Sequence, residues 1–444
     1  MGSSDLEAVG AAPHDLIAQK SRDHIGAYLE TRDRWNAASS LKALTDAAAR
    51  EYEDRFLIEL IQNGYDAHLA EKRDGRIVIR LARDEGEHGT IYVANGGTPF
   101  TESNFNALCE IAQSDKKPGE SVGHKGVGFT SVLQVCAWPE IYSGDEAQRL
   151  SGSLGGFCFG FAKPEDVLKL TEGDETAAQA VVHDISPYFL PIPLEHKPQA
   201  VRQLANEGLA TVVRLPLESE VALQVAEEQI RFLRQSKAPL MLFLERLDRL
   251  DIVTTGGGRP SEMTALTRRA EQLRPQPLLG GGRLELVDLG HQGRWLLASR
   301  AVDEARLKKA LAESVDSGQI DEAWTDWTAP AVVSVATRSD ADEVDPQMYT
   351  FLPMGKHAPA PFWGHLNAPF STKLARLDIN DRVPLNALFL GVPPLSWTPE
   401  RLVGSVRPGG KDAPPCQGDR ISRSRTRRSF VVRRSRCIAA AVVR

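Results

Sequence analysis

No stretch of this sequence is apolar for long enough to cross a membrane. No run approaches the roughly 20 apolar residues that span a bilayer, and the first thirty residues contain no apolar signal core after a basic start. We therefore expect a cytoplasmic protein with no membrane partner.

Cysteine is scarce and badly placed for either a metal site or a disulfide framework. The five cysteines are odd in number and widely spaced, and no two form a Cys-x-x-Cys pair. We expect reduced, mostly structural thiols at Cys109, Cys136, Cys158, Cys416 and Cys437.

A strong overall charge is also lacking. The 444 residues carry a formal net charge of −6, and 42% are hydrophobic and 25% charged, which excludes collagen, a disulfide miniprotein and global disorder. Residues 401–444 nevertheless hold eleven arginines and one lysine against two aspartates, a charge of +10, which leaves −16 for residues 1–400. We expect a disordered Arg-rich tail at 401–444, because so polar a segment buries too little surface to offset its ordering entropy. Only this tail suggests a nucleic-acid partner.

Hydrophobic periodicity divides the remaining chain into an N-terminal helical arm at 1–45, a domain at 46–217 and a second domain at 218–400. The order of helices and strands favours an α+β fold with segregated layers over a regular βαβ array. We expect helices at about 13–49, 52–72, 102–113, 220–236 and 303–317, and strands at about 76–82, 90–94, 210–217, 242–255, 283–289, 294–299 and 331–337.

Three polar residues share one face of the helix expected at 52–72. Glu59, Asn63 and Asp66 lie at i, i+4 and i+7, so two carboxyl groups and an amide form one stripe. Because Mg²⁺ prefers oxygen ligands and keeps several waters, the Asn63 oxygen and nucleotide phosphates would hold it, while Glu59 deprotonates a water. The solvated face of an amphipathic helix explains the same spacing, so the stripe alone does not identify an enzyme.

A glycine-rich segment lies at Gly123-His124-Lys125-Gly126-Val127-Gly128-Phe129. Its glycines permit close approach of the backbone to a ligand, and the apolar run after it predicts a helix start whose free N–H groups attract phosphate. Its order is neither the dinucleotide Gly-x-Gly-x-x-Gly nor a P-loop. Ser114 and Lys116 lie upstream in a loop long enough to form a lid. A plain glycine-rich turn and an exposed basic loop are the alternatives.

Asn95-Gly96-Gly97 follows the strand expected at 90–94. The glycines let a turn approach a planar base, while the Asn95 amide can accept from an exocyclic amine and donate to a ring nitrogen. A simple Asn-Gly turn is the alternative.

The order of these motifs resembles the GHKL superfamily of gyrase, heat-shock chaperones, histidine kinases and MutL-type ATPases. The sequence runs Glu-x-x-x-Asn-x-x-Asp-Ala, then Asn-Gly-Gly, then Gly-x-x-Gly-x-Gly-Phe, then a Thr-bearing strand around Thr211. Residues 52–63 and 121–129 are most similar to the sacsin-like and heat-shock-chaperone-like branch. The resemblance covers about residues 50–217, and 345–395 more loosely.

This resemblance implies a Bergerat-type α/β sandwich at 46–217 that binds ATP and Mg²⁺. It implies that Glu59 is the general base, that Asn63 is the magnesium ligand, that Asp66 lies near the nucleotide and that Thr211 helps to hold adenine. The phosphate-binding turn would contain Gly123, Lys125, Gly126, Val127, Gly128 and Phe129, with Ser114 and Lys116 in the lid.

One residue departs from the family pattern. Most members have Asp-x-Gly-x-Gly, with the Asp accepting from the adenine amino group, where this chain has Asn95 followed by Gly96 and Gly97. A neutral acceptor makes a bond of roughly half the strength of a charge-assisted one. We therefore expect weaker selectivity for adenine than for phosphate. Sacsin-like sequences share this Asn-Gly form.

The domain at 218–400 would correspond to the family's smaller α/β transducer domain, in which a basic residue reaches the γ-phosphate. Lys356 and Lys373 are the candidates, and ordinary surface lysines are the alternative.

The resemblance implies a slow Mg²⁺-dependent ATPase that acts as a conformational switch of chaperone or defence type. Its partners would be a protein client or effector chain, and a second copy in a nucleotide-dependent homodimer. The alternatives are a nucleotide-binding interaction module without turnover and, after it, a phosphotransferase similar to histidine kinases.

Overall fold

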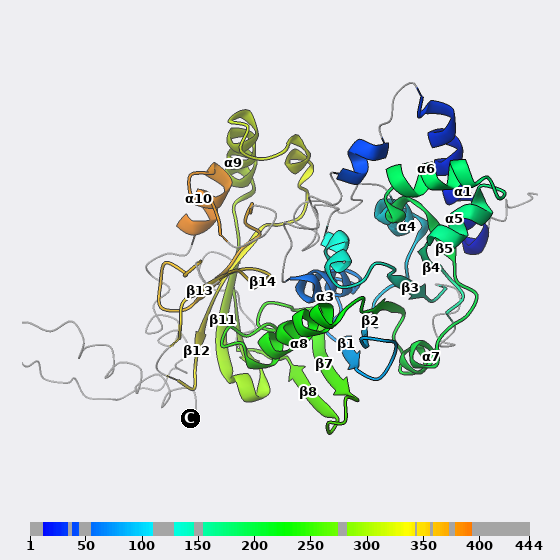
Figure 1. Ribbon diagram of the computed structural model, residues 1–444. Helices are drawn as coiled ribbons and strands as arrows, with labels where there is room; N and C mark the ends of the chain where they lie inside the picture. Colours follow the sequence, from blue (N-terminus) through cyan, green and yellow to red (C-terminus); the bar gives the residue numbers. More distant parts are fainter. Residues whose placement is uncertain are drawn as a thin grey trace, which may run out of the picture. The chain divides into compact units, whose positions relative to one another are not determined.

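The computed structural model describes residues 12–33, 38–43, 55–109, 128–145, 154–273, 282–341, 344–355, 358–372 and 378–392. They form two compact units (Figure 1). The first contains the described residues up to Ser236 together with Leu244–Thr267, and the second contains Lys237–Phe243 and the described residues from Arg268 onward. The Arg-rich tail expected at 401–444 lies outside the described residues.

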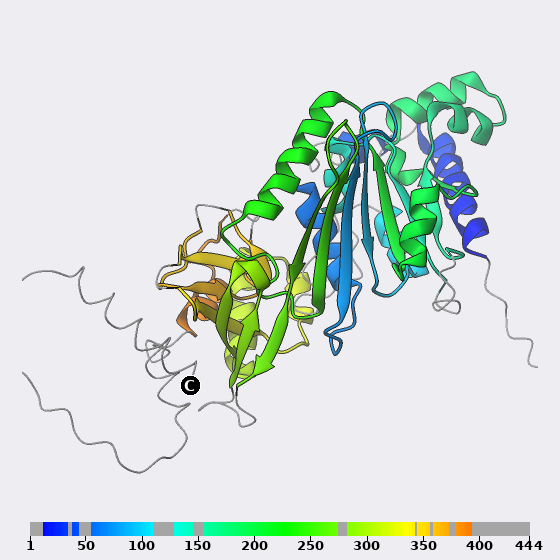
Figure 2. The ribbon, with the colours of Figure 1, turned by 90° about the horizontal axis from the view of Figure 1, so that it is seen from below.

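One mixed sheet forms the centre of the first unit. Its strand order is β5-β4-β3-β6-β2-β1-β7-β8, and only β1 and β7 are parallel neighbours. Figure 2 shows β1, in blue, beside β7, in green. The strands are β1 (Gly75–Ala82), β2 (Thr90–Asn95), β3 (Glu140–Ser143), β4 (Cys158–Phe161), β5 (Pro191–Pro193), β6 (Thr211–Pro216), β7 (Leu247–Thr255) and β8 (Glu262–Thr267).

Helices cover both faces of this sheet. The α-helices are α1 (Pro13–Thr31), α3 (Phe56–Asp66), α4 (Glu102–Cys109), α5 (Pro164–Leu170), α6 (Glu175–Asp184), α7 (Gln199–Asn206) and α8 (Glu220–Gln235), and the 3-10 helices are η1 (Gly128–Gln134) and η3 (Pro187–Phe189). Residues 38–43 are also helical. On one face, Val201 and Leu204 of α7 pack against Val78, Tyr92 and Val212. α3 lies on the other face, beside α8 (Figure 1).

α3 is held against the sheet by a glycine and capped from a neighbouring helix. A Cβ on Gly64 would lie 3.0 Å from Ile77 Cδ1, so the absence of a side chain there lets the helix approach β1. The Leu57 N–H, one of the amides that a helix leaves unpaired in its first turn, donates to the Gln229 side chain of α8 at 3.0 Å. α8 is itself capped by the Ser219 hydroxyl, which accepts from the Ala222 N–H.

The second unit contains another mixed sheet, with strand order β14-β13-β15-β12-β11-β10-β9. Only β13 and β15 are parallel neighbours in it. Its elements are β9 (Arg269–Gln272), β10 (Gly282–Asp288), η4 (Gly290–Gln292), β11 (Arg294–Ala301), α9 (Glu304–Asp316), η5 (Glu322–Asp326), β12 (Val332–Arg338), β13 (Gln347–Thr350), β14 (Leu352–Pro353), β15 (His365–Asn367) and α10 (Pro384–Gly391).

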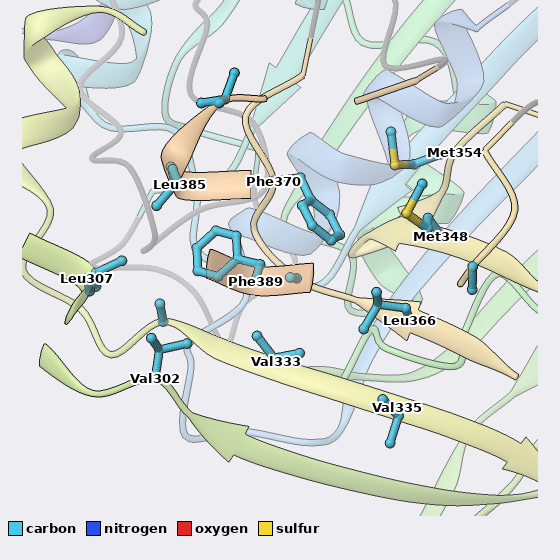
Figure 3. Close-up of a cluster of buried hydrophobic side chains, with 14 of the residues drawn as sticks. Val302, Leu307, Val333, Val335, Met348, Met354, Leu366, Phe370, Leu385 and Phe389 are labelled. Atoms are coloured by element: carbon cyan, nitrogen blue, oxygen red, sulfur yellow. The ribbon is translucent and has the colours of Figure 1, made fainter. Parts of the chain in front are cut away.

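Apolar residues of the second unit form a core of their own. Phe389 of α10 and Phe370 lie near Val333 and Leu366 from the strands, and the ring centroids of the two phenylalanines are 5.8 Å apart (Figure 3). Burial of such side chains stabilises each by about 1.5–3 kcal/mol. The unit therefore has a hydrophobic core independent of the first.

Two mixed sheets with helices confirm the expected α+β class. The division between the units differs from the boundary expected at 217 and 218, because α8, β7 and β8 complete the first unit. In α8 the expected helix is present almost residue for residue, whereas the helix start expected after Gly128 is the 3-10 helix η1. The helix expected from 52 begins at Phe56 in the described residues and ends at Asp66.

Among the described residues, none of the helices combines the length and the apolar character needed to cross a bilayer.

Candidate functional site

The polar stripe of α3 lies on a helix that is otherwise buried. Glu59 is only 4% exposed, whereas Asn63 and Asp66 are half-buried. The Glu59 Oε1 atom has no hydrogen-bond partner among the described residues. A buried polar atom without a partner costs about 1–3 kcal/mol, so structures normally supply one from a water or a ligand. The predicted general base therefore has an unused acceptor.

A row of three polar residues lies across three neighbouring strands of the first sheet. Asn95 of β2 is paired in register with Thr211 of β6, and Thr211 is paired with Ser143 of β3. The Ser143 and Thr211 hydroxyl oxygens are 3.2 Å apart, and the Phe100 N–H donates to the Ser143 hydroxyl at 2.8 Å. This row, which we call the Asn95 row, joins two residues predicted from the sequence with Ser143, which was not predicted.

The turn after β2 brings the Asn95 row close to α3. Gly97 donates its N–H to Asn95 Oδ1 at 3.1 Å, and a Cβ on Gly97 would lie 2.5 Å from the Ala67 carbonyl oxygen. The same carbonyl accepts from the Thr98 N–H at 2.8 Å. A Cβ on Gly64 would lie 3.4 Å from Asn95 Cβ. Because residues 64 and 97 are glycines, α3 can lie close to Asn95, and the turn after β2 can lie close to the Ala67 backbone.

The end of the glycine-rich segment packs against the same helix. Gly128 begins η1, and η1 and α3 are in contact. The Phe129 ring lies 6.1 Å from the Tyr188 ring, edge to face. The phenol oxygen of Tyr188 is buried without a partner among the described residues, and burial raises the pKa of Tyr188 well above its ordinary value. Phe129 therefore anchors η1 in an aromatic core.

Eight predicted site residues lie outside the described residues, so their predictions are untested. They are Ser114, Lys116, Gly123, Lys125, Gly126, Val127, Lys356 and Lys373. The structure brings together Glu59, Asn63, Asp66, Asn95, Gly97 and Thr211 around α3 and the neighbouring end of the sheet, with Gly128 and Phe129 at the start of η1.

The oxygen atoms of the stripe are of the kind that magnesium prefers as ligands. The described residues contain no cluster of three or more His, Cys, Asp or Glu side chains placed to hold a metal. Magnesium is commonly held by one or two protein oxygens together with waters and substrate phosphates. The half-buried Asn63, the predicted magnesium ligand, fits that limited role.

One further residue of the stripe escaped the sequence analysis. Gln62 is 1% exposed, and both its amide oxygen and its amide nitrogen lack hydrogen-bond partners among the described residues. It lies three residues after Glu59 and therefore on the same side of α3. The i, i+3 spacing was visible in the sequence, but the burial was not.

The fold and this site define an α+β protein in which a helix with one polar stripe packs on a face of a mixed sheet. No family model matches the chain. The chain is similar to Protein NO VEIN of Arabidopsis thaliana, with 36% identity over 92 residues, which is 20% of this chain and 3% of that protein. It is also similar to human Sacsin, with 33% identity over 112 residues, which is 22% of this chain and 2% of that protein.

These similarities agree in part with the resemblance found in the sequence. The match to Sacsin supports a likeness to sacsin-like sequences over about a fifth of the chain. The chain spans only a small part of either relative, so the likeness is confined to one segment of each. Membership of the GHKL superfamily stays a prediction.

Proposed function

We propose that this protein binds ATP with Mg²⁺ in a Bergerat-type first unit, hydrolyses it slowly and uses the nucleotide as a conformational switch. The observation that carries the proposal is the buried Glu59 carboxylate, whose Oε1 atom has no partner in the part of the chain that the structure describes, on the helix that packs against η1. Asn95 and Thr211 lie in register at the neighbouring end of the sheet. These observations support Glu59 as the base and the Asn95 row as the neighbouring polar part of the site.

Each described group has a distinct part in this reaction. The Glu59 carboxylate takes a proton from water, which attacks the γ-phosphorus. The Asn63 oxygen would hold magnesium, which supplies charge neutralisation at the phosphates when bound, and Asp66 would lie near the nucleotide. The Thr211 hydroxyl and the Asn95 amide would orient the adenine, and the backbone of Gly128 and Phe129 would face the phosphates.

The groups outside the described residues complete the proposal. Lys125 and the glycines at 123 and 126 would surround the phosphates, Ser114 and Lys116 would close over them, and Lys356 or Lys373 would contact the γ-phosphate. ATP-dependent closure would then change how the protein meets a client, an effector chain or a second copy.

The direct test is phosphate release by the full-length protein and by a Glu59→Ala variant. Loss of a general base lowers the rate by about 10²–10⁴-fold, so we expect release by the variant to fall at least 100-fold while ATP still raises the melting temperature. The matched control is Glu228→Ala, which removes an exposed carboxylate of α8 and should leave both readings unchanged.

The outcomes separate the candidate functions. Equal phosphate release by the wild type and the Glu59→Ala variant, or no thermal shift with ATP, rejects the ATPase. A thermal shift without phosphate release by the wild type favours a nucleotide-binding module without turnover.

A further inference from the structure

Gln62 is an unusual residue to bury. Its side chain is 1% exposed, yet neither its amide oxygen nor its amide nitrogen has a hydrogen-bond partner among the described residues. An amide in this state destabilises the fold relative to an apolar side chain of the same shape. Gln62 therefore lowers the stability of the fold, and packing alone does not explain its presence.

The buried Gln229 of α8 shows what a structural glutamine does in this fold. Its Oε1 atom accepts the Leu57 N–H at 3.0 Å and so caps the first turn of α3. Gln62, on α3 itself, makes no such contact with the backbone of any residue that the structure describes. The two buried glutamines, at 1% and 7% exposed, thus differ at the amide oxygen, which has a backbone partner only in Gln229; neither amide nitrogen has a partner among the described residues.

Helix geometry places Gln62 beside the predicted base. Glu59, Gln62, Asn63 and Asp66 have the spacing 0, 3, 4 and 7, which lies within one face of an α-helix. Within the described ranges, Glu59 Oε1 and the two Gln62 amide atoms are three buried atoms without partners on that face. A buried water typically makes about three hydrogen bonds, and these atoms are two acceptors and one donor.

We propose that Gln62 positions the water that Glu59 activates; this inference rests on the ATPase function proposed above. The Gln62 oxygen accepts one hydrogen of the water, and the Gln62 nitrogen donates to a lone pair. Glu59 takes the other proton as the water oxygen forms a bond to the γ-phosphorus. The bond from that phosphorus to the β–γ bridging oxygen breaks, and ADP leaves with the electron pair. Gln62 is a positioning residue, since it exchanges no proton.

The test compares full-length wild type with a Gln62→Met variant, because methionine has nearly the same volume but forms no strong hydrogen bonds. We expect kcat for ATP hydrolysis to fall at least tenfold, because misplacing a reactant by about 1 Å costs up to about 10²-fold. The KM and the affinity for ATP should change less than about twofold. The melting temperature should rise by about 2–4 °C, because an unpaired buried amide is removed.

A Gln229→Met variant is the matched control. It removes the cap on the Leu57 N–H, so it should lower the melting temperature while kcat per folded molecule stays within about twofold of wild type. A purely structural Gln62 would behave in the same way as Gln229.

A Gln62→Leu variant provides a second test of the same point. If the wild type hydrolyses ATP and both Gln62 variants have the wild-type kcat, the positioning role is overturned but the ATPase function stands. ATP binding without wild-type hydrolysis overturns both the turnover and this role. A lower kcat with an unchanged KM and a raised melting temperature supports the inference.

Discussion

At the scale of single residues, the buried polar groups of the site differ in their hydrogen-bond partners. Glu59 and Gln62 carry atoms without partners in the described parts of the chain, whereas Ser143 and Thr211 contact each other. The sequence predicted Glu59 and Thr211 but neither Gln62 nor Ser143. A glutamine within a helical polar stripe is indistinguishable from a solvated one until the covering elements are known, and Ser143 joins the row only through the pairing of β3 with β6.

Asn95 provides a prediction at this scale. Its only side-chain oxygen already accepts the Gly97 N–H, whereas an aspartate would offer a second acceptor to the amino group of adenine. We expect Asn95→Asp to tighten ATP binding about 5- to 10-fold, near 1–1.4 kcal/mol, and to weaken GTP binding, because the guanine carbonyl is repelled by a carboxylate. Titration calorimetry with both nucleotides measures the change. Equal changes in affinity for ATP and GTP would contradict this role for Asn95.

At the scale of elements, long periodic segments were predictable and short or distant pairings were not. The expected helix at 220–236 is α8, and its Ser219 cap explains the start. The strands β13, β14 and β15 have two to four residues, too few for a periodic pattern. The parallel pairing of β1 with β7 could not be predicted, because it joins Ile77 to Leu250 across most of the first unit.

Strand β15 carries a buried histidine that should make the second unit sensitive to acid. His365 is 1% exposed, and its ring stacks on Trp295 with centroids 4.8 Å apart and lies 5.2 Å from Tyr349. Neither ring nitrogen has a partner among the described residues. Burial lowers the pKa of His365 to about 4, and the opposing attraction of Asp345 is smaller.

The sign of the pH effect follows from this lowered pKa. The unfolded histidine takes up its proton near pH 6.5, whereas the folded one resists protonation until about pH 4. Stability from this residue is therefore full above pH 6.5 and falls by about 3 kcal/mol as the pH drops to 4. A His365→Phe variant keeps an aromatic ring and should lose less stability between pH 7 and 4 in urea unfolding.

The exposed His291 supplies a control for the acid effect. His291→Gln should retain the wild-type pH dependence, because His291 is exposed and is not one of the rings packed around His365. An identical loss of stability in wild type and His365→Phe would show that other groups cause it.

At the scale of the whole molecule, the formal net charge of −6 is the sum of −16 on residues 1–400, the body of the chain, and +10 on residues 401–444. We expect the full-length chain to be retained on immobilised DNA at low salt and to elute as salt rises, because arginines release counterions from phosphates. A chain of residues 1–400 should pass through at moderate salt. Its retention would place the nucleic-acid contact in the body and contradict the prediction.

The parallel pairing of β1 with β7 also bears on how the chain is made. While a ribosome is still producing α8, β1 is complete but its partner on that edge does not yet exist. An exposed strand edge is a template for pairing with other chains. The nascent chain must therefore keep one central strand half-paired until Thr255 has emerged, and this interval is when binding by a chaperone would protect it most.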